Sequence, residues 1–337
     1  MLRFLMATII GVETTAHTFG VAVIKDGRVL SNVKSIFTTE KGGLIPMEVR
    51  KHHEEKAPEI YEKALLDAKI SGKDIEGIAF SNAPGLAPCL LAGMEFVKKK
   101  VRELNVPVVC VNHCIAHLEI GEMFGARDPV MLYASGANTQ IIAYEAGKYR
   151  VFGETLDLGV GNFIDTFARF AGLGFPGGPK IQKLADECKN KDILIKLPYS
   201  VKGMDVSFSG IQTKLKTLLD KGVSLEDLSY SMQEHIFAML VEAAERALAH
   251  TGKKELLLGG GVACNSRLQE MCKLMCEARG VKFICPDRSF LVDNAGMIGY
   301  LGEKMFLAGL KIEAGKIDEV DIKPRERTDD VIVCWKK

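Results

Sequence analysis

One arrangement of strands and turns occurs twice in the chain, and this repeat restricts the folds that the chain can adopt. From residue 7, ATIIGVETTAHTFGVAVIKDGRVLSNVKS predicts a strand, a turn of small polar residues, a strand, a turn at Asp26-Gly27 and a third strand. From residue 130, VMLYASGANTQIIAYEAGKYRVFGETLD predicts the same order, with its second turn at Gly147. The sequence therefore predicts a duplicated fold.

The segments that follow each copy correspond as well. GIAFSNAPGLAP (77–88) and ELLLGGGVACNSRL (255–268) each predict a strand that runs into a glycine-rich loop. VPVVCVNH (106–113) and VKFICPDRSFLVDN (281–294) each predict an apolar strand, which leads to His113 in the first half and to Asp293 in the second. With helices in the gaps, we predict two α/β domains of one plan around a cleft, where ligands bind at the carboxyl ends of strands.

The domain boundaries follow from the repeat. We place an N-terminal domain at residues 1–129 and a C-terminal domain at residues 130–293, with the option that segment 294–337 packs back on the first. A chain of 337 residues with 47% hydrophobic content is long enough for two such cores.

Charge and cysteine content restrict the partners and the compartment. Lys and Arg number 44 against 43 Asp and Glu, a net charge of +1, so no strong basic field indicates that the chain binds nucleic acid alone. Nine cysteines without a C-x-x-C pair predict reduced thiols and a cytoplasmic protein. The apolar start MLRFLMATIIGV predicts a buried strand, and no apolar run reaches membrane-spanning length.

The stretch VNHCIAHLEIG (111–121) contains a histidine pair with metal-ligand spacing. Asn112 is a predicted helix N-cap, which places His113 and His117 on one helical face. Asp293 ends the equivalent strand of the second half, and Tyr133 begins the second polar turn. These four side chains predict a divalent metal site, and the donor set suits Fe(II) or Zn(II) equally. The alternative is two partly buried histidines bonded to backbone carbonyls.

A zinc protease is the competing interpretation of this pair. H-E-x-x-H enzymes carry a general-base Glu directly after the first histidine. Here Cys114 occupies that place, and Glu119 falls outside the pair. The protease hypothesis therefore has no evident base for activating water.

The two polar turns, ETTAHT (13–18) and SGANT (135–139), predict anion-binding loops that offer backbone N–H groups and hydroxyls. Glu13, Thr14 and Thr15 are the candidates in the first turn. The layout resembles the actin, Hsp70 and sugar-kinase (ASKHA) superfamily, in which two such turns hold phosphates. LLLGGGVACN is the candidate for the adenosine-binding junction, because glycine permits close backbone approach.

The ordered motifs also resemble one family closely over nearly the whole chain. This is the universal tRNA N6-adenosine threonylcarbamoyltransferase family (the TsaD family), and more narrowly its archaeal and eukaryotic branch, the catalytic subunit of the KEOPS complex. The motifs that carry the resemblance are VNHCIAHLEIG, YASGANTQIIAY, YRVFGETLDLGVGNFID, GFPGGPK, LPYSVKGMDVSFSG, GGGVACNSRLQEM, DNAGMI and RTDDVIVCW.

The resemblance implies a metal-dependent acyltransferase that moves threonylcarbamoyl from threonylcarbamoyl-AMP to N6 of the adenosine 3′ of the anticodon, in tRNAs reading codons that begin with A. It implies Fe(II), an adenylate or ATP site, and as partners tRNA, a small kinase-like ATPase and a small dimerising subunit. It implies metal ligation by His113, His117 and Asp293, with Tyr133 nearby. The implied substrate-binding residues are Tyr133, Ala134, Ser135, Gly136, Ala137, Asp165, Gly178, Gln182 and Asn265.

The sequence departs from the family pattern at a few positions. Ala137 stands where the family has glycine, which costs on the order of 1 kcal/mol if the position needs a positive φ. Ala83 also replaces a glycine, Leu91 an arginine, and Gln182 the glutamate usual in archaeal members. An alternative is therefore a divergent nucleotide-binding regulatory subunit with weak or no transfer activity.

Overall fold

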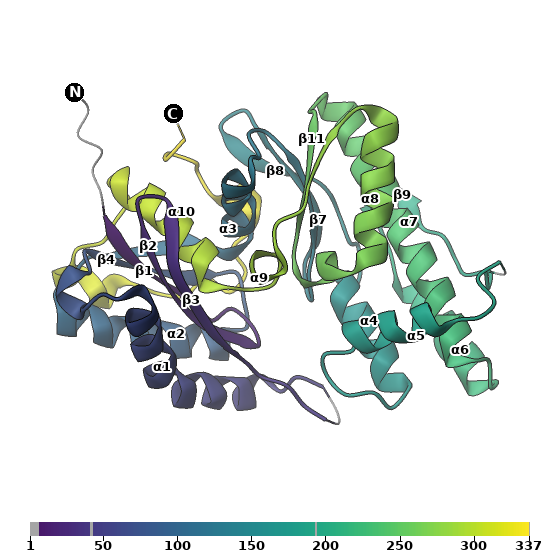
Figure 1. Cartoon of the computed structure of the whole chain (residues 1–337), viewed down its shortest axis with the longest axis horizontal. Helices are drawn as coiled ribbons and strands as arrows, with labels where there is room; N and C mark the ends of the chain where they lie inside the picture. Colours follow the sequence, from purple (N-terminus) through teal and green to yellow (C-terminus); the bar gives the residue numbers. More distant parts are fainter. Residues whose placement is uncertain (1–6, 41–42, 193, 337) are drawn as a thin grey trace. The chain divides into compact units, whose positions relative to one another are not determined.

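The computed structural model describes residues 7–40, 43–192 and 194–336, which form two compact units (Figure 1). Unit 1 comprises Met1–Phe37, Leu44–Ile120 and Asp293–Lys337, and unit 2 comprises Thr38–Gly43 and Gly121–Val292. Unit 1 thus draws on three separate stretches of chain. The domain boundaries predicted after residues 129 and 293 concern which segments fold independently, and they stay a prediction.

Unit 1 is built on a five-stranded mixed sheet. Its strands are β1 (Thr8–Glu13), β2 (Thr18–Lys25), β3 (Arg28–Ile36), β4 (Gly77–Ala83) and β5 (Val108–Asn112). Their order is β3-β2-β1-β4-β5, in which β1, β2 and β3 are antiparallel and β4 and β5 continue parallel to β1. The carboxyl ends of β1, β4 and β5 therefore meet at one edge of the sheet.

The sheet of unit 2 repeats this topology. Its strands are β6 (Val130–Ala134), β7 (Thr139–Glu145), β8 (Lys148–Glu154), β11 (Glu255–Gly259) and β12 (Lys282–Ile284). Their order, β12-β11-β6-β7-β8, again joins an antiparallel meander to two parallel strands. The predicted duplication is confirmed.

The two meanders also use the same kind of hairpin turn. Asp26 and Gly27 have φ of 55° and 68°, and Ala146 and Gly147 have φ of 51° and 80°. Two consecutive positive φ values are typical of the type I′ turn, whose twist suits a two-residue hairpin. The turns predicted at Asp26-Gly27 and Gly147 are therefore confirmed.

Helices cover both faces of the unit 1 sheet. Helices α1 (Pro46–Ala68) and α2 (Ala87–Leu104) enclose a core with alternate residues of β1, such as Ile10 and Val12. Helix α10 (Ala295–Leu307) packs on the other face, directly against Gly11. A short helix, α3 (His113–Glu119), continues from β5.

Unit 2 has its core around the long helix α7, which buries residues along its whole length. The helices of this unit are α4 (Val160–Phe170), α5 (Gly178–Glu187), α6 (Ser209–Asp220), α7 (Leu225–Thr251), α8 (Ser266–Arg279) and α9 (Arg288–Leu291). A two-residue hairpin adds β9 (Val201–Lys202) and β10 (Asp205–Val206). Short 3-10 helices along the chain are Gly72–Asp74, Ile120–Phe124, Gly261–Cys264, Ala314–Glu319 and Thr328–Asp330.

The apolar start of the chain has its predicted environment where it is described, and five of the nine cysteines are buried. β1 is a fully buried strand from Thr8, while residues 1–6 of the predicted strand lie outside the described residues. Burial raises the pKa of Cys276 to about 11 and of Cys89 to about 12, as expected for inert buried thiols. Among the helices described, none combines the length and apolarity needed to cross a membrane.

Candidate functional site

The histidine pair lies on α3, at the end of β5. Asn112 caps the helix as predicted, because its Oδ1 accepts hydrogen bonds from the N–H groups of Cys114 and Ile115 at 3.1 and 3.3 Å. One helical turn separates His113 from His117, and their ring centroids are 4.9 Å apart. Both imidazoles are buried and lie side by side.

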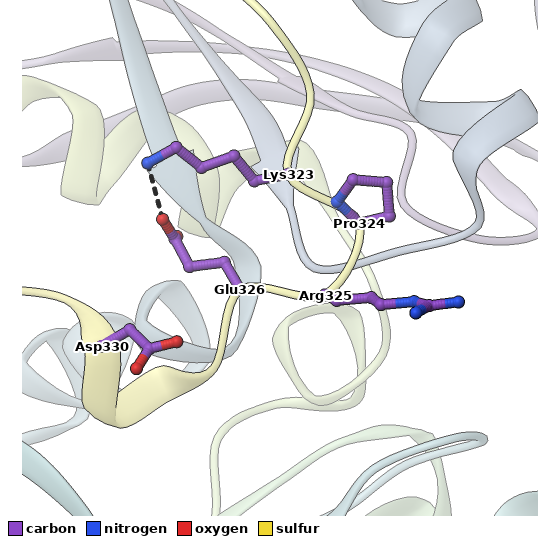
Figure 2. A pocket seen from close by; sticks show the side chains of 5 residues that line it. All are labelled: Lys323, Pro324, Arg325, Glu326 and Asp330. Carbon is purple, nitrogen blue, oxygen red and sulfur yellow. Dashed lines mark hydrogen bonds and ion pairs between the residues drawn. The ribbon is translucent and has the colours of Figure 1, made fainter.

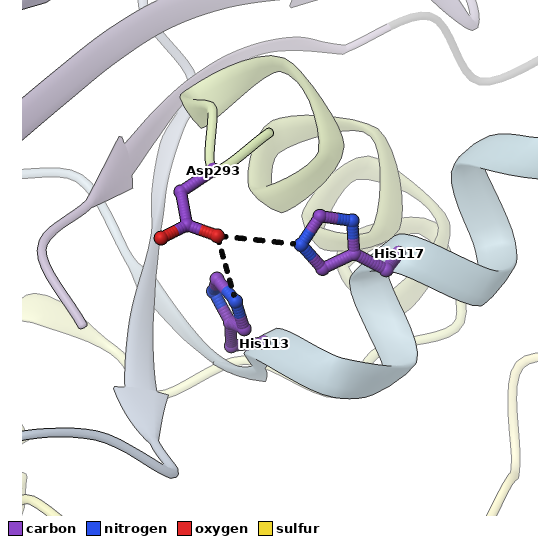
Figure 3. A group of neighbouring side chains, drawn as sticks. All are labelled: His113, His117 and Asp293. Atoms are coloured by element: carbon purple, nitrogen blue, oxygen red, sulfur yellow. Dashed lines mark ion pairs between the residues drawn. The ribbon is translucent and has the colours of Figure 1, made fainter. Parts of the chain in front are cut away.

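Asp293 completes a three-residue cluster with these histidines (Figure 3). Its Oδ1 lies 3.3 Å from Nε2 of His113 and 3.6 Å from Nε2 of His117. One nitrogen or oxygen atom from each of the three residues lies within 4.8 Å of the others. The predicted grouping of these residues is thus present in unit 1.

Strand β3 fixes the segment that carries Asp293. The carbonyl oxygen of Asp293 accepts a hydrogen bond from Nζ of Lys34 at 3.2 Å. The side chain of Asn32 donates to Asn294 and accepts from the N–H of Gly296. The carboxylate therefore projects from a backbone that is held on one side by the sheet and continued on the other by α10.

Glu13 is a fourth member of the cluster. Its Oε2 lies 2.9 Å from Nδ1 of His113, and its Oε1 accepts from the N–H and the hydroxyl of Thr15 at 2.7 and 2.5 Å. A carboxylate on Nδ1 fixes the tautomer and orientation of the imidazole, so that Nε2 faces Asp293. Sequence reasoning assigned Glu13 to a phosphate turn and missed this contact. No local sequence signal indicates this contact, because it depends on the sheet order, in which β1 and β5 both flank β4 in parallel and end at one sheet edge.

The charges of the cluster favour a cation between the carboxylates. Burial opposes the charged form of His113, but Glu13 and Asp293 outweigh it and hold the pKa of this imidazole well above its ordinary value. The pKa of Asp293 lies well below its ordinary value despite burial, because His113 stabilises the carboxylate. Burial lowers the pKa of His117. The environment thus favours the neutral form of the His117 imidazole and the charged form of the Asp293 carboxylate.

The backbone N–H groups of Thr14 and Thr15 in the first turn are engaged within unit 1. The N–H of Thr14 donates to Oγ of Ser81 at 3.1 Å, and the N–H of Thr15 donates to Glu13. In this conformation, a phosphate bound at the turn would need hydrogen-bond donors other than these two N–H groups. Two departures from the family pattern lie in this unit: Ala83 is the buried end of β4, and Leu91 is a partly buried residue of α2 that packs against the core.

The second polar turn, Ser135–Thr139, is compact and packed against glycines. Ser135 bonds Asn138 through its N–H and its hydroxyl, at 2.9 and 3.0 Å. The N–H of Gly161 donates to the carbonyl oxygen of Ser135, which ties the turn to the start of α4. Gly260 approaches from β11 with a φ of 92°, and a Cβ there would lie 2.3 Å from the carbonyl oxygen of Ala134. This glycine is required by both its backbone angle and its packing.

Ala137 fits the turn without backbone strain. Within the described residues, the non-glycine positions with positive φ are Asp26, Lys69, Asn105 and Ala146. Ala137 therefore does not need the left-handed conformation that would have made its methyl group costly. Its side chain is exposed.

The other predicted substrate-binding residues lie in unit 2, where Asp165, Gln182 and Asn265 each make a hydrogen bond. Asp165 accepts from the N–H of Gly177 at 2.7 Å, just before Gly178 begins α5. Gln182 donates to Oγ of Ser266 at 3.0 Å. Asn265 caps α8 and also donates to Gln233 at 2.7 Å. Tyr133 is buried in β6.

Comparison with known proteins identifies relatives along nearly the whole chain. The family model described as tRNA N6-adenosine threonylcarbamoyltransferase matches residues 28–300. A protein of that name from Thermococcus sibiricus is 51% identical over 327 residues, covering 97% of this chain and 99% of the relative. A probable bifunctional tRNA threonylcarbamoyladenosine biosynthesis protein from Methanosarcina mazei is 50% identical over 98% of this chain, which spans 60% of that longer protein.

Solved structures with low sequence identity share the fold. HypF from T. kodakarensis aligns with a TM-score of 0.61 at 15% identity, over 90% of this chain and 48% of that one. Component A of the (R)-2-hydroxyglutaryl-CoA dehydratase from Acidaminococcus fermentans aligns with a TM-score of 0.54 at 14% identity, over 88% and 98% of the two chains. These matches and the repeated sheet topology confirm the predicted fold, a duplicated α/β fold of the actin-like ASKHA type.

Proposed function

Because the chain belongs to the tRNA N6-adenosine threonylcarbamoyltransferase family, we propose that it transfers threonylcarbamoyl from threonylcarbamoyl-AMP to N6 of the adenosine 3′ of the anticodon. N6 attacks the carbamoyl carbon, the bond from that carbon to the phosphate oxygen breaks, AMP leaves, and N6 releases one proton. The observation that carries the proposal is the cluster of buried His113 and His117 with partly buried Asp293, in a chain half identical to named transferases.

We also propose that this cluster holds one divalent metal ion. Two imidazoles and one carboxylate are a donor set that Fe(II) and Zn(II) accept, and Glu13 supplies the carboxylate that commonly supports a metal-bound histidine. Family resemblance favours Fe(II). Such an ion would act as a Lewis acid and an anchor for an anionic group of the donor. Tyr133 as a further ligand stays a prediction.

The adenylate of the donor, or ATP, is proposed to bind unit 2. The turn Ser135–Ala137 would offer N–H groups to the phosphate, and a preorganised donor favours AMP as it leaves. Asp165 and Asn265 would hold ribose hydroxyls, with Gly178 and Gln182 beside them. Support comes from the compact turn and its glycine packing. Asp165 and Asn265 already make backbone contacts, so ribose binding would add to a capping role.

The activity is tested by reconstitution. The purified chain is combined with its partner subunits, a tRNA transcript and threonylcarbamoyl-AMP generated in situ, and nucleosides from the digested tRNA are analysed by mass spectrometry. Formation of N6-threonylcarbamoyladenosine supports the proposal. A folded, metal-loaded chain that gives none contradicts it, and retained nucleotide binding would then support the regulatory-subunit alternative.

Glu13→Gln is expected to weaken metal binding by about 10- to 100-fold. The substitution keeps the shape of the side chain but removes the charge that orients His113 and balances a cation. The variant is compared with the parent chain by isothermal titration with Zn(II), using Glu48→Gln, on the first turn of α1, as the matched control. Equal affinities in the Glu13 variant and the parent would remove Glu13 from the proposed metal site.

Partner subunits are proposed to supply much of the tRNA contact, in the cytoplasm. The basic run on α2 is largely paired with acids: Lys100 and Lys99 lie 2.9 and 3.9 Å from Glu103, and Arg102 pairs with Asp318. At fixed salt, we expect the isolated chain to bind tRNA at least about tenfold more weakly than the chain with a kinase-like ATPase and a dimerising subunit. Filter binding measures both affinities, and tight binding by the isolated chain would refute the expectation.

A further inference from the structure

The C-terminal segment Lys323–Lys336 contacts both ends of the helix that carries the histidine pair. It enters beside β4, where the N–H of Lys323 donates to the carbonyl oxygen of Asn82 at 2.8 Å. A pocket at this point is lined by Lys323, Pro324, Arg325, Glu326 and Asp330 (Figure 2). The segment then runs through buried Val333 to buried Trp335. Both the segment and α3 belong to unit 1.

At the amino end of α3, the contact is made through the N-cap. Asn112 accepts two backbone hydrogen bonds with Oδ1 and donates with Nδ2 to Oε2 of Glu326 at 3.1 Å. Lys323 pairs with Oε1 of the same glutamate at 2.7 Å. Glu326 thereby fixes the orientation of the amide that caps the histidine helix.

At the carboxyl end of α3, the contact is made through Glu119. Its side chain is fully buried, and Oε1 accepts from Nε1 of Trp335 at 2.9 Å and lies 3.4 Å from Nζ of Lys336. Its Oε2 pairs with Lys304 of α10. One buried carboxylate therefore joins the C-terminal segment, the histidine helix and α10, which begins at Ala295, close to Asp293 in the chain.

Helix α3 has seven residues, too few to define its own position. Its location must come from tertiary contacts, and a metal site tolerates little displacement of its ligands. We propose that Glu326 and Trp335 are positioning residues, which hold α3 from its two ends so that His113 and His117 face Asp293 in metal-binding geometry. This inference rests on the proposed metal site.

Two substitutions test the proposal, each removing one contact. Trp335→Phe keeps an aromatic ring and deletes the Nε1 donor, while Glu326→Ala deletes the acceptor at Asn112. Zn(II) affinity of the full chain is measured by isothermal titration, with unfolding midpoints recorded in parallel. We expect each variant to bind Zn(II) about tenfold or more weakly, as for outer-shell contacts at other metal sites. Ile332→Ala, at an exposed position of the same segment, is the matched control and should stay within about twofold.

The outcomes separate this inference from the metal proposal. A parent chain that binds Zn(II), with variants that bind it equally well, overturns the positioning role alone, even if their unfolding midpoints fall. A parent chain that binds no divalent metal overturns the metal proposal and this inference together.

A second measurement needs no substitution in the segment. If docking of the segment strengthens metal binding, then metal binding must strengthen docking by the same factor. Zn(II) should therefore slow amide hydrogen exchange across residues 323–336 in the parent chain but not in His117→Ala. Exchange in this segment that is unchanged by saturating Zn(II) would overturn the proposal.

Discussion

The His113→Ala chain is expected to retain no specifically bound divalent metal and to form threonylcarbamoyladenosine about a thousandfold more slowly or not at all. The substitution removes one of the three side chains of the proposed metal site and leaves two carboxylates, Glu13 and Asp293, without the imidazole between them. A metal ion that polarises a reacting group lowers the barrier by several kcal/mol. Its loss therefore slows the reaction by a factor of about a thousand.

Metal content after dialysis and the yield of modified nucleoside are the two readouts for this variant. Asp293→Asn, which keeps the shape of the side chain, should give the same result and guards against misfolding of the alanine variant. His250→Ala, an exposed histidine near the end of α7, should behave like the parent chain. Full metal occupancy and full product in His113→Ala would refute the metal centre.

The Gly11→Ala chain is expected to lose about 3 kcal/mol of unfolding free energy or more. A Cβ at position 11 would lie 2.3 Å from the carbonyl oxygen of Ala295 and 2.6 Å from the backbone nitrogen of Gly299. These are backbone atoms, which cannot rotate away as a side chain can. Strand β1 and helix α10 would have to separate. Since β1 ends in Glu13 and α10 begins beside Asp293, metal affinity should fall with stability.

Urea denaturation of the apo chain measures this loss as a lower midpoint. Gly315→Ala is the matched control, because a Cβ there meets no atom within 4 Å and its φ is not in the left-handed region. An unchanged midpoint in Gly11→Ala would show that β1 and α10 do not need their close approach.

Local sequence patterns were sufficient to predict the repeated sheets, their hairpin turns and the cap on the histidine helix. Each depends on signals within a few residues, such as an Asp-Gly turn or Asn112 before a helix. The grouping of His113 and His117 with Asp293 was predicted from equivalent strand ends in the two halves. The grouping is present, but the reason was wrong, because β12 ends at Ile284 and Asp293 follows α9 as the first residue of the last stretch of unit 1.

Contacts that depend on packing between distant segments were not predictable. Glu13 follows a strand and precedes two threonines, which is equally typical of an anion-binding turn, and only the sheet order places it against His113. From the sequence alone, Glu119 is predicted to be an ordinary carboxylate on a helix surface. Its burial depends on contacts with Lys304 of α10 and with Trp335 of the C-terminal segment. Both are distant in the sequence, and local periodicity does not predict such contacts.

The three-part construction of unit 1 also bears on how the protein is synthesised. The strands and the histidine helix are translated early, but α10, which covers one face of their sheet, and Asp293 are translated only after all of unit 2. Until then, the face of β1 and β2 at Gly11 and Ala22 has no cover from α10. On the ribosome, unit 2 can therefore complete its fold first, although unit 1 begins the chain. Arrest peptides placed after residues 292 and 336 would time the two events.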